Sequence, residues 1–438
     1  MAQLFPFRAF RYNPARVRLA DVVTQPYDKI SPAMQERYYA ASPGNLVRIV
    51  LGKREPGDSE HNNVYTRAAA CFHDWRRNGI FRQDDAPSFY AYSQRFVVPG
   101  TSGPEYERHG FVGAGRLEEY DAGVIFRHEQ TLSAPKADRL NLLRATGAHF
   151  EQIFMLYSDP ARRLDSLLFA SAAEPDIHVE DEYGVRHCLW KVSDAEIVGQ
   201  VQAFMRDRRL IIADGHHRYE TALNYRNERR AHAAEAGCPP NPDAPYERMM
   251  MTFVNMDAEG LVILPTHRVV FGLPQFDVVG TVERLRPYFG VDLLPERVTP
   301  ESAVRLLAQK GADTTALLAV TAAGDFILEA RDGAADALMA GLSPRQRRLD
   351  VAKLHKIVLE HVLGICEEDI RHQKHINYVR EAREAIERVR EGANVAFLMN
   401  PVTVQQMRDV AFAGEVMPQK STDFYPKLLS GLTVYALE

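Results

Sequence analysis

The stretch Leu210-Ile-Ile-Ala-Asp-Gly-His-His-Arg-Tyr-Glu-Thr-Ala-Leu223 joins a strand pattern to a helix pattern through a single glycine. Its four leading apolar residues predict a short buried strand that ends at Asp214. Gly215 permits a tight turn and the close approach of a ligand to the backbone. The start of the following helix offers free N–H groups, a positive dipole end and the guanidinium of Arg218, which together suit a phosphate.

The polar residues of this turn have two possible roles. Asp214 is placed to hold a Mg²⁺ ion or a hydroxyl group, and His216 and His217 can orient phosphates or a base. The alternative is that Asp214 only caps the helix and the histidines solvate the turn. We favour the ligand site, because turns seldom place two His, an Arg and an Asp together unless a ligand collects them.

On both sides of this stretch, short apolar runs typical of strands alternate with segments of helical periodicity. Further buried strands are expected at 249–254 and 261–264, and the segments 88–98 and 111–117 predict two antiparallel strands joined by a loop. Apolar residues recur at helical spacing over 350–363 and 380–390. We therefore predict a mixed α/β (α+β) chain. We expect an N-terminal α/β region (1–125), a catalytic core (126–270) and a C-terminal α/β region (271–438).

Composition limits the functional classes. The chain has 438 residues, 46% of them apolar and 25% charged, which is typical of globular proteins. Its formal net charge of −5 provides no basic field for nucleic acid or an anionic membrane. The four cysteines lack metal spacing, and no run of eighteen apolar residues is present. Residues 1–10 show no apolar stretch with charged flanks, so we expect no signal peptide. We expect a cytoplasmic protein with no nucleic-acid or membrane partner.

A second polar cluster, Arg127-His128-Glu129-Gln130-Thr131, is followed by Lys136, Asp138 and Arg139 near the start of a helix. It is not an HExxH zinc site, because Leu132 occupies the position of the second His. A carboxylate beside a His and several cations suits general base catalysis. A capping and ion-pair cluster at a helix start is an equally good interpretation.

A third cluster, Gly414-Glu-Val-Met-Pro-Gln-Lys-Ser-Thr-Asp-Phe-Tyr-Pro-Lys427, lies near the C-terminus. Lys420, Ser421 and Thr422 offer an ammonium, two hydroxyls and backbone donors for a phosphate. The cluster is not a GxxxxGK[ST] phosphate loop, because the glycines of that motif are absent, and the chain has no GxGxxG motif. The alternative interpretation of the cluster is a solvated basic turn. His267 and Arg268 form a weaker fourth candidate, in which the His is equally well explained as a structural residue.

These segments resemble a widespread prokaryotic family, the domain of unknown function numbered ten-fifteen, over nearly the whole chain. The Asp214–Arg218 segment also looks like the phosphate-binding motif of the ParB/sulfiredoxin superfamily. Within that superfamily the likeness is to archaeal free-serine kinases, which phosphorylate the hydroxyl of L-serine. The resemblance implies a ParB/sulfiredoxin-like core with additional N-terminal and C-terminal α/β regions.

Three segments match these kinases in the same order. The resemblance makes Glu129 of His128-Glu-Gln the catalytic base, gives Asp214–Arg218 the nucleotide and the metal, and gives the 414–422 segment the phosphate. This chain departs from the pattern by Gln419, inserted between Pro and Lys, and by Ser421 in place of a Thr. About 125 N-terminal residues have no counterpart, so the acceptor substrate is less defined than the chemistry.

The expected function is that of a kinase dependent on Mg²⁺ and on ATP or ADP, acting on a small hydroxylated metabolite, with free serine as the first candidate. A phosphatase or nucleotide hydrolase, and a non-catalytic nucleotide-binding regulatory protein, are the alternatives. The candidate residues fall into groups by role: catalytic Glu129, Asp214 (also the metal ligand), His216 and His217; nucleotide-binding Gly215, Arg218, Lys420, Ser421 and Thr422; substrate-binding His128, Lys136, His267 and Arg268. We expect the 414–427 segment to return to the core.

Overall fold

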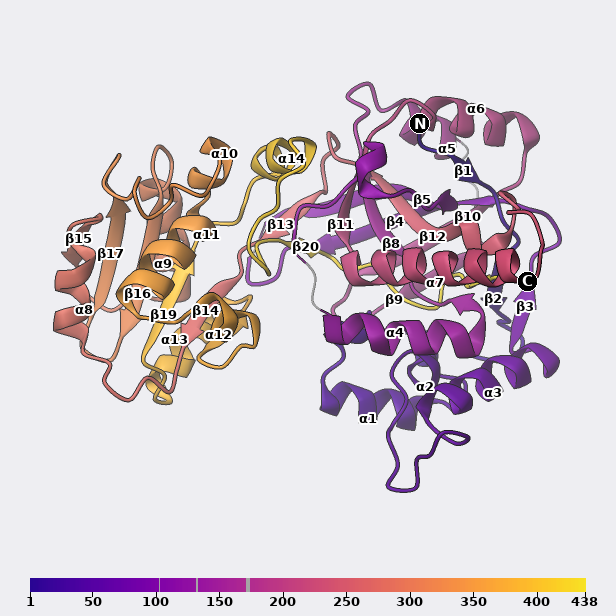
Figure 1. The fold of residues 1–438 in the computed structure, drawn as a ribbon, viewed down its shortest axis with the longest axis horizontal. Coiled ribbons are helices and arrows are strands. Elements are labelled where there is room, and N and C mark those ends of the chain that lie inside the picture. Colours follow the sequence, from indigo (N-terminus) through magenta and orange to yellow (C-terminus); the bar gives the residue numbers. More distant parts are fainter. Residues whose placement is uncertain (102, 131–132, 171–173) are drawn as a thin grey trace. The chain divides into compact units, whose positions relative to one another are not determined.

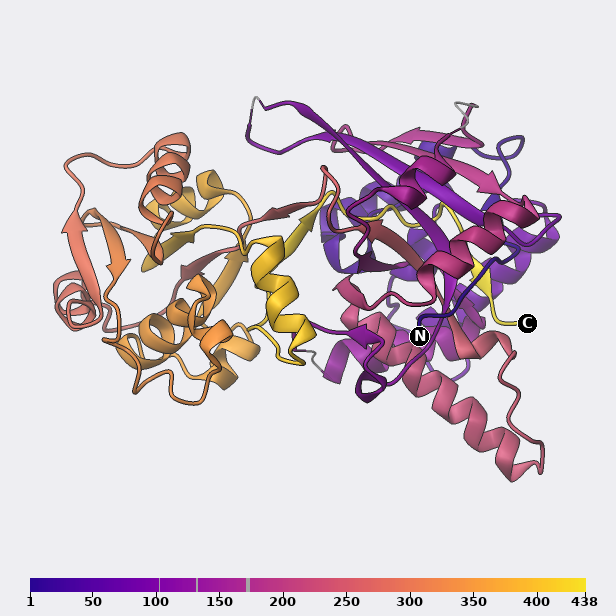
Figure 2. The same ribbon diagram turned by 90° about the horizontal axis from the view of Figure 1, so that it is seen from above.

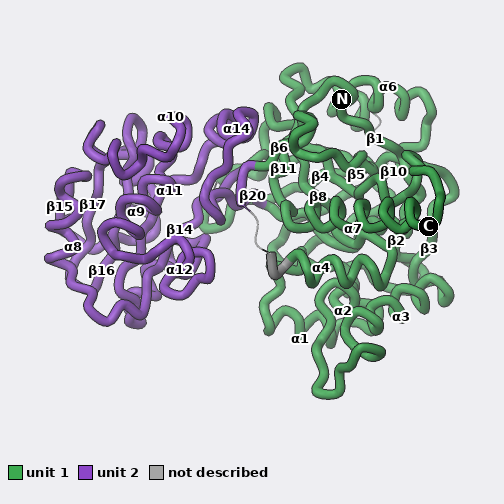
Figure 3. Tube along the Cα trace, in the orientation of Figure 1, with its two compact units in different colours: residues 1–127, 131–261, 426–438 green, residues 128–130, 262–425 purple. Residues whose placement is uncertain are grey.

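The structure is a computed structural model that describes residues 1–101, 103–130, 133–170 and 174–438. It divides into two compact units, coloured separately in Figure 3. Unit 1 comprises residues 1–127, 131–261 and 426–438, and unit 2 comprises residues 128–130 and 262–425. Each unit combines sheets with helices (Figure 1), which confirms the mixed α/β class predicted from the sequence.

A large mixed sheet forms the centre of unit 1, with strand order β6-β11-β8-β12-β5-β4-β10-β9 and with β1 paired to β5. Its strands are β1 (Leu4–Phe5), β4 (Phe89–Val97), β5 (Glu105–Arg116), β6 (Ile125–Phe126), β8 (Ile153–Tyr157), β9 (Ile177–Glu180), β10 (Arg186–Val192), β11 (Leu210–Asp214) and β12 (Arg248–Asn255). Strand β11 runs parallel to β6 and antiparallel to β8. The motif turn after Asp214 therefore leaves the sheet one strand in from its β6 edge.

The hairpin expected from residues 88–98 and 111–117 is confirmed as antiparallel β4 and β5. Strand β5 begins at Glu105, inside the segment expected to be loop, so the pairing extends further than the sequence indicated. Figure 2 shows this hairpin extending beyond the neighbouring strands of its sheet. The expected strands at 210–213 and 249–254 are likewise present, in β11 and β12.

Both faces of the central strands are covered, which explains why β8 is buried at every position. On one face Met155 and Phe253 share a core with residues of α6 (Ala195–Met205) and α7 (His216–Glu235). On the other face Met250 meets Thr433 of the C-terminal segment, with 3.3 Å between Oγ1 and Sδ. The last residues of the chain thus complete the core around the first sheet.

Helices α1 to α4 of unit 1 pack outside α7, whereas α5 contacts α6. Helix α4 contacts α7, and α3 contacts α4, so the helices form successive layers beside the sheet (Figure 1). These helices are α1 (Pro32–Ala41), α2 (Val47–Val50), α3 (Val64–Arg77), α4 (Ser133–Thr146) and α5 (Arg163–Leu168). Two small sheets pair β2 (Phe10–Tyr12) with β3 (Phe81–Gln83) and β7 (Ala148–His149) with β21 (Tyr435–Ala436).

Unit 2 is built on an antiparallel sheet with strand order β15-β17-β16-β19-β14-β18. Its strands are β14 (His267–Val270), β15 (Phe289–Leu293), β16 (Ala316–Thr321), β17 (Asp325–Ala330), β18 (Ile376–Val379) and β19 (Val395–Met399). A separate pair joins β13 (Val262–Leu264) to β20 (Asp423–Tyr425). The helices are α8 (Val278–Leu285), α9 (Pro300–Lys310), α10 (Pro344–Arg347), α11 (Asp350–Lys353), α12 (Glu367–Arg371), α13 (Ala382–Arg390) and α14 (Val404–Phe412).

The helix expected over 350–363 differs from an ordinary α-helix. After α11 the chain continues as the π-helix η5 (Leu354–Val362), and the amide of Leu363 donates to the carbonyl five residues earlier, at Val358, over 2.9 Å. The sequence pattern could not separate the two forms, because apolar residues four apart lie on one side of either helix. The π-helix is rare, mostly occurs as a single turn within an α-helix, and is frequent at functional sites.

None of the helices in the described residues combines the length and the apolar character that crossing a bilayer requires.

Candidate functional site

The Asp214 turn in unit 1 is a compact charged cluster. Strand β11 ends at Asp214, Gly215 takes φ 95°, and α7 begins at His216. The carboxylate of Asp214 accepts from Lys427 Nζ at 3.1 Å and from Arg218 Nη2 at 2.9 Å. Burial raises the pKa of Asp214, but the charges of Lys427, Arg218 and Lys29 outweigh it and hold that pKa well below its usual range. The carboxylate is therefore ionised and engaged by cations on both oxygens.

Steric contacts explain why the residue in this turn is a glycine. A Cβ atom on Gly215 would lie 2.9 Å from Ile153 Cδ1 and 3.1 Å from Arg218 Nη2, and φ is in the left-handed region. Arg218 is buried against the turn and also donates through Nη1 to the carbonyl of Gln152 at 2.7 Å. His216 is buried and His217 is partly exposed in the first turn of α7.

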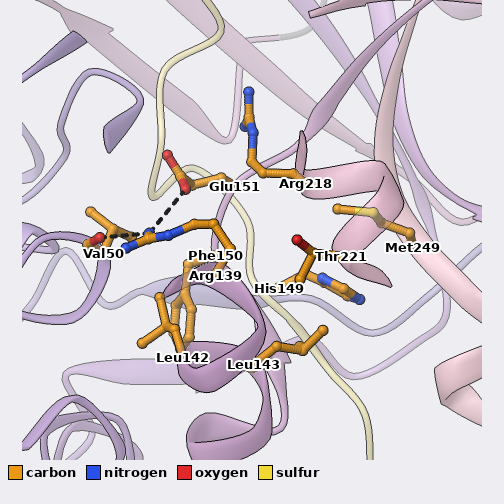
Figure 4. Close-up of a pocket in the computed structure, with 11 residues that line it drawn as sticks. Val50, Arg139, Leu142, Leu143, His149, Phe150, Glu151, Arg218, Thr221 and Met249 are labelled. Carbon is orange, nitrogen blue, oxygen red and sulfur yellow. Dashed lines mark hydrogen bonds and ion pairs between the residues drawn. The ribbon is translucent and has the colours of Figure 1, made fainter. Parts of the chain in front are cut away.

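A cavity of about 40 Å³ lies beside Arg218 in unit 1. Figure 4 shows Arg139 of α4 reaching toward Glu151 and Val50 at its edge. Arg139 donates to the carbonyl of Val50 at 2.7 Å and lies 3.9 Å from the carboxylate of Glu151, which also accepts from the amide of Tyr27 at 2.8 Å. Burial raises the pKa of Glu151, against the lowering effect of Arg218 and Arg139. The anion site expected here thus contains the buried carboxylate of Glu151 and the partly buried carboxylate of Asp214 as well as its cations.

Residues 128–130 belong to unit 2, where they meet the C-terminal motif. Glu129 forms a parallel bridge with Met417, and the amide of Met417 donates to the carbonyl of His128 at 2.8 Å. The amide and the hydroxyl of Thr422 both donate to Glu129 Oε1, at 3.0 and 3.1 Å. His128 Nε2 lies 2.8 Å from the same hydroxyl. Because that hydroxyl gives its hydrogen to Glu129, His128 donates through Nε2–H.

Arg268 organises the turn that carries the remaining phosphate candidates. It is fully buried in β14 and donates to the carbonyl of Lys420 at 3.0 Å. Burial lowers the pKa of Arg268 to about 10, so the guanidinium stays charged at neutral pH. Ser421 donates to the carbonyl of Pro418 at 2.5 Å, and Lys420, at φ 56°, is exposed. The turn therefore presents an ammonium from a backbone conformation that is uncommon for a side chain other than glycine.

Two of the residues predicted to bind substrate, His267 and Lys136, interact with other residues of the protein. His267 is buried, and its Nδ1 accepts from the amide of Met399 at 3.3 Å, while burial and the charge of Arg268 lower its pKa to about 3. Lys136 pairs with Glu220 of α7 at 2.8 Å. Their assignment to substrate stays a prediction.

The candidates thus gather in two groups. Unit 2 holds His128, Glu129, His267, Arg268, Lys420, Ser421 and Thr422, and unit 1 holds Lys136, Asp214, Gly215, His216, His217 and Arg218. The 414–427 segment contacts both groups, because Thr422 bonds Glu129 and Lys427 bonds Asp214. That both groups serve one ligand stays a prediction.

Sequence reasoning missed Glu151, and it named Arg139 and Lys427 only as members of the second and third clusters, without a role of their own. For Lys427 a signal existed, because a single charge inside the run Phe424-Tyr-Pro-Lys-Leu-Leu429 indicates a buried and paired side chain. Glu151 and Arg139 carry no comparable local signal. Their pairing brings α4 to the segment before β8, and only the fold reveals it.

Comparison with known proteins identifies the family. The model of the family described as "Protein of unknown function (DUF1015)" matches residues 4–352. The chain belongs to this family. No curated protein gives a match.

Solved structures with some likeness include a conserved hypothetical protein from Pyrococcus furiosus, with 14% identity, 72% of this chain and 92% of that chain covered, and a TM-score of 0.36. Free serine kinase in complex with AMP has 14% identity, covers 69% of this chain and 83% of its own, and has a TM-score of 0.34. SbnI from Staphylococcus aureus has 11% identity, coverages of 74% and 87%, and a TM-score of 0.36.

The side chains of the described residues do not form a binding site for a resident metal ion. Among the described residues, no group of three or more His, Cys, Asp and Glu side chains could hold a metal. Both oxygens of Asp214 already accept a hydrogen bond from a cation, so a metal ion at this carboxylate would lie beside the charges of Lys427 and Arg218, which oppose its binding. Asp214 as a metal ligand therefore stays a prediction.

Proposed function

We propose that the chain is a nucleotide-dependent phosphotransferase that acts on the hydroxyl of a small metabolite, with free L-serine as the first candidate. One observation carries the proposal: Thr422 holds the carboxylate of Glu129 through a single oxygen, Oε1. Within the part of the chain that the structure describes, no hydrogen bond reaches Oε2 of Glu129. A general base needs this combination of fixed direction and a free lone pair.

Phosphoryl transfer asks little covalent chemistry of a protein. The hydroxyl oxygen of the acceptor attacks the terminal phosphorus, and the bond from that phosphorus to the rest of the nucleotide breaks. Glu129 accepts the proton that the hydroxyl loses, a role usually worth roughly 10²–10⁴ in rate. The hydroxyl of Thr422, backed by His128, keeps the carboxylate pointed while the proton moves.

The nucleotide phosphates need cations and N–H donors in fixed positions. Lys420 and the hydroxyl of Ser421 belong to the turn next to Glu129, and the exposed ammonium of Lys420 suits a phosphate. We assign the start of α7, with Gly215, His216, His217 and Arg218, to phosphates as well, because its amides and dipole favour an anion. Any Mg²⁺ would arrive on the nucleotide, since this ion keeps few protein ligands when phosphates bind it.

A direct assay tests the proposal. Purified protein with Mg²⁺ is incubated with ATP and, separately, with ADP, against a panel of small hydroxyl acceptors headed by L-serine. Mass spectrometry should detect a phosphorylated acceptor. Glu129→Gln keeps the shape of the side chain and removes its basicity, so turnover should fall by roughly two to four orders of magnitude while donor affinity survives.

Three results would contradict the proposal. Free phosphate without a phosphorylated acceptor would indicate a hydrolase. Nucleotide binding without any turnover would indicate a regulatory protein. A Glu129→Gln enzyme within about threefold of the native rate would remove Glu129 from the role of base and leave it a structural hydrogen-bond acceptor.

A further inference from the structure

Unit 2 contains a cavity that borders the segments already described but has had no ligand assigned to it. Its volume is about 200 Å³. Its walls come from α10, α11, η5 and α12, from the 416–419 stretch and from Gln130, which follows Glu129. Apolar side chains make up much of the lining: Leu342, Ala352, Ile370, Val416, Met417 and Pro418. We call this space the unit 2 cavity.

One wall of the unit 2 cavity is the π-helix, and this wall carries an unusual histidine. His355 lines the cavity and is 5% exposed. Its Nε2 atom has no hydrogen-bond partner among the described residues. Burial, with the charges of Arg268 and Lys356, lowers the pKa of His355, so the ring is neutral at physiological pH. An unpaired buried nitrogen costs free energy that a ligand can recover.

Charges of both signs line the same cavity. Lys356 pairs with Glu360 at 2.9 Å, and Arg371 pairs with Glu367 at 3.1 Å. All four side chains line the unit 2 cavity, and their charges sum to zero. A ligand with one net charge would leave one member of these pairs uncompensated, whereas a zwitterion can exchange partners with both pairs.

The volume limits the size of the ligand. An apolar cavity of about 150 Å³ holds benzene, which has six heavy atoms. The unit 2 cavity, at about 200 Å³, therefore suits about eight heavy atoms. A nucleoside monophosphate is several times too large. A small amino acid has the right size.

We propose that the unit 2 cavity binds a small zwitterion with an apolar body, which is the chemistry of an aliphatic α-amino acid. The carboxylate of the ligand pairs with Arg371 or Lys356, its ammonium pairs with Glu360 or Glu367, and its side chain packs on the apolar wall. The ligand is not the phosphorylated acceptor, because an aliphatic side chain has no hydroxyl to react. The ligand is therefore distinct from the proposed acceptor, although the cavity shares its 416–419 wall with the segment proposed to bind phosphate.

Calorimetry on the full chain tests the proposal with L-leucine and two analogues. 3-Methylbutylamine lacks the carboxylate, and 4-methylpentanoate lacks the ammonium. L-Leucine should bind, and each analogue should bind at least about tenfold more weakly, because one charged contact is lost. Arg371→Met should weaken L-leucine by about tenfold and leave 3-methylbutylamine unchanged.

The chain offers a matched control for this variant. Arg388 pairs with Glu384 one helical turn away, at 2.8 Å and with similar exposure, but does not line the cavity. Arg388→Met should leave L-leucine affinity unchanged. Circular dichroism checks that both variants fold, and Glu360→Gln provides a second variant, which should weaken L-leucine more than 4-methylpentanoate.

The proposal fails if no aliphatic amino acid binds, or if the two analogues bind as well as L-leucine. It also fails if L-serine binds more tightly than L-leucine, since the cavity would then be an acceptor pocket. Equal losses in Arg371→Met and Arg388→Met would show a general charge effect. None of these results depends on turnover, so the proposed phosphotransferase is tested separately.

Discussion

At the scale of the residue, Thr422 fixes the direction of the carboxylate of Glu129, which we propose as the general base. Its amide and hydroxyl fix one carboxylate oxygen, and the hydroxyl also ties in the buried His128. The sequence singled out Glu129 and Thr422 separately, one as a base and the other as a phosphate contact. For the proposed reaction we therefore assign Thr422 to positioning Glu129, because its hydroxyl is already engaged by that carboxylate.

Thr422→Val tests this positioning. The variant keeps the shape and the backbone amide but loses the hydroxyl, so Glu129 retains one of its two hydrogen bonds. We expect phosphotransferase kcat to fall by about tenfold with little change in donor KM, because a hydrogen bond to a charged group is worth about 1.5 kcal/mol and about 1.4 kcal/mol is a factor of ten in rate. Thr422→Ser restores the hydroxyl and should restore most of the rate. A loss of equal size in Thr422→Ser would contradict the role of the hydroxyl.

The paired cations around Asp214 carry a second prediction at this scale. Lys427 is buried, and Lys427→Met removes one of the two cations that are hydrogen-bonded to the partly buried carboxylate of Asp214. We expect the free energy of unfolding to fall by about 2 kcal/mol. In an Asp214→Asn background the same substitution should cost clearly less, since the charge it serves is gone. Urea unfolding of the four proteins measures the coupling, and additive losses would contradict the ion pair.

At the scale of the element, strand spacing in unit 1 depends on a glycine. Gly110 of β5 pairs with Val254 of β12, and a Cβ atom there would lie 2.6 Å from the carbonyl oxygen of Phe253. Backbone cannot yield as a side chain does, so Gly110→Ala should lower the free energy of unfolding by about 1–3 kcal/mol. Gly199 on exposed α6 faces open space, and Gly199→Ala should instead stabilise by about 0.5–1 kcal/mol. Similar effects of the two substitutions, measured by urea unfolding, would contradict this close approach.

Local sequence patterns predicted most elements because their causes are local. The alternation over 88–98 and the run 210–213 gave strands β4 and β11, and the apolar spacing over 380–390 gave α13. The sequence pattern did not predict the π-helix, because the choice between an α-helix and a π-helix depends on which residues pack inward. Tertiary contacts determine that packing. The ion pair of Glu151 with Arg139 was not predicted for the same reason, since it joins two segments whose packing no local sequence pattern specifies.

At the scale of the whole molecule, short segments far apart in the chain build each unit. Residues 128–130 lie in unit 2 although most of their neighbours in sequence lie in unit 1, and residues 426–438 return to unit 1. Motif order in the sequence was informative about chemistry. It could not assign each motif to a unit, because that assignment rests on contacts such as Glu129 with Met417, nearly 300 positions apart.

Each unit also contains a buried histidine that should make folding sensitive to acid. In unit 1, burial lowers the pKa of His149 to about 4, and in unit 2 burial and Arg268 lower that of His267 to about 3. In the unfolded chain both rings titrate near pH 6.5. Protons therefore bind the unfolded chain more readily in the window between these values. Stability is complete above about pH 6.5 and falls as the pH drops, by up to roughly 1.4 kcal/mol per pH unit for each ring.

Urea unfolding between pH 7.5 and pH 4.5 measures this dependence. His149→Gln removes one titrating ring, so unfolding of unit 1 should depend less on pH across the window, while the exposed His61→Gln should leave the dependence as it is. The carboxylate of Asp214, whose pKa is held low, loses its proton far below this window and so adds no slope of the same sign near pH 6. A profile of His149→Gln that matches the native profile would show that another group, and not this ring, destabilises unit 1 in acid.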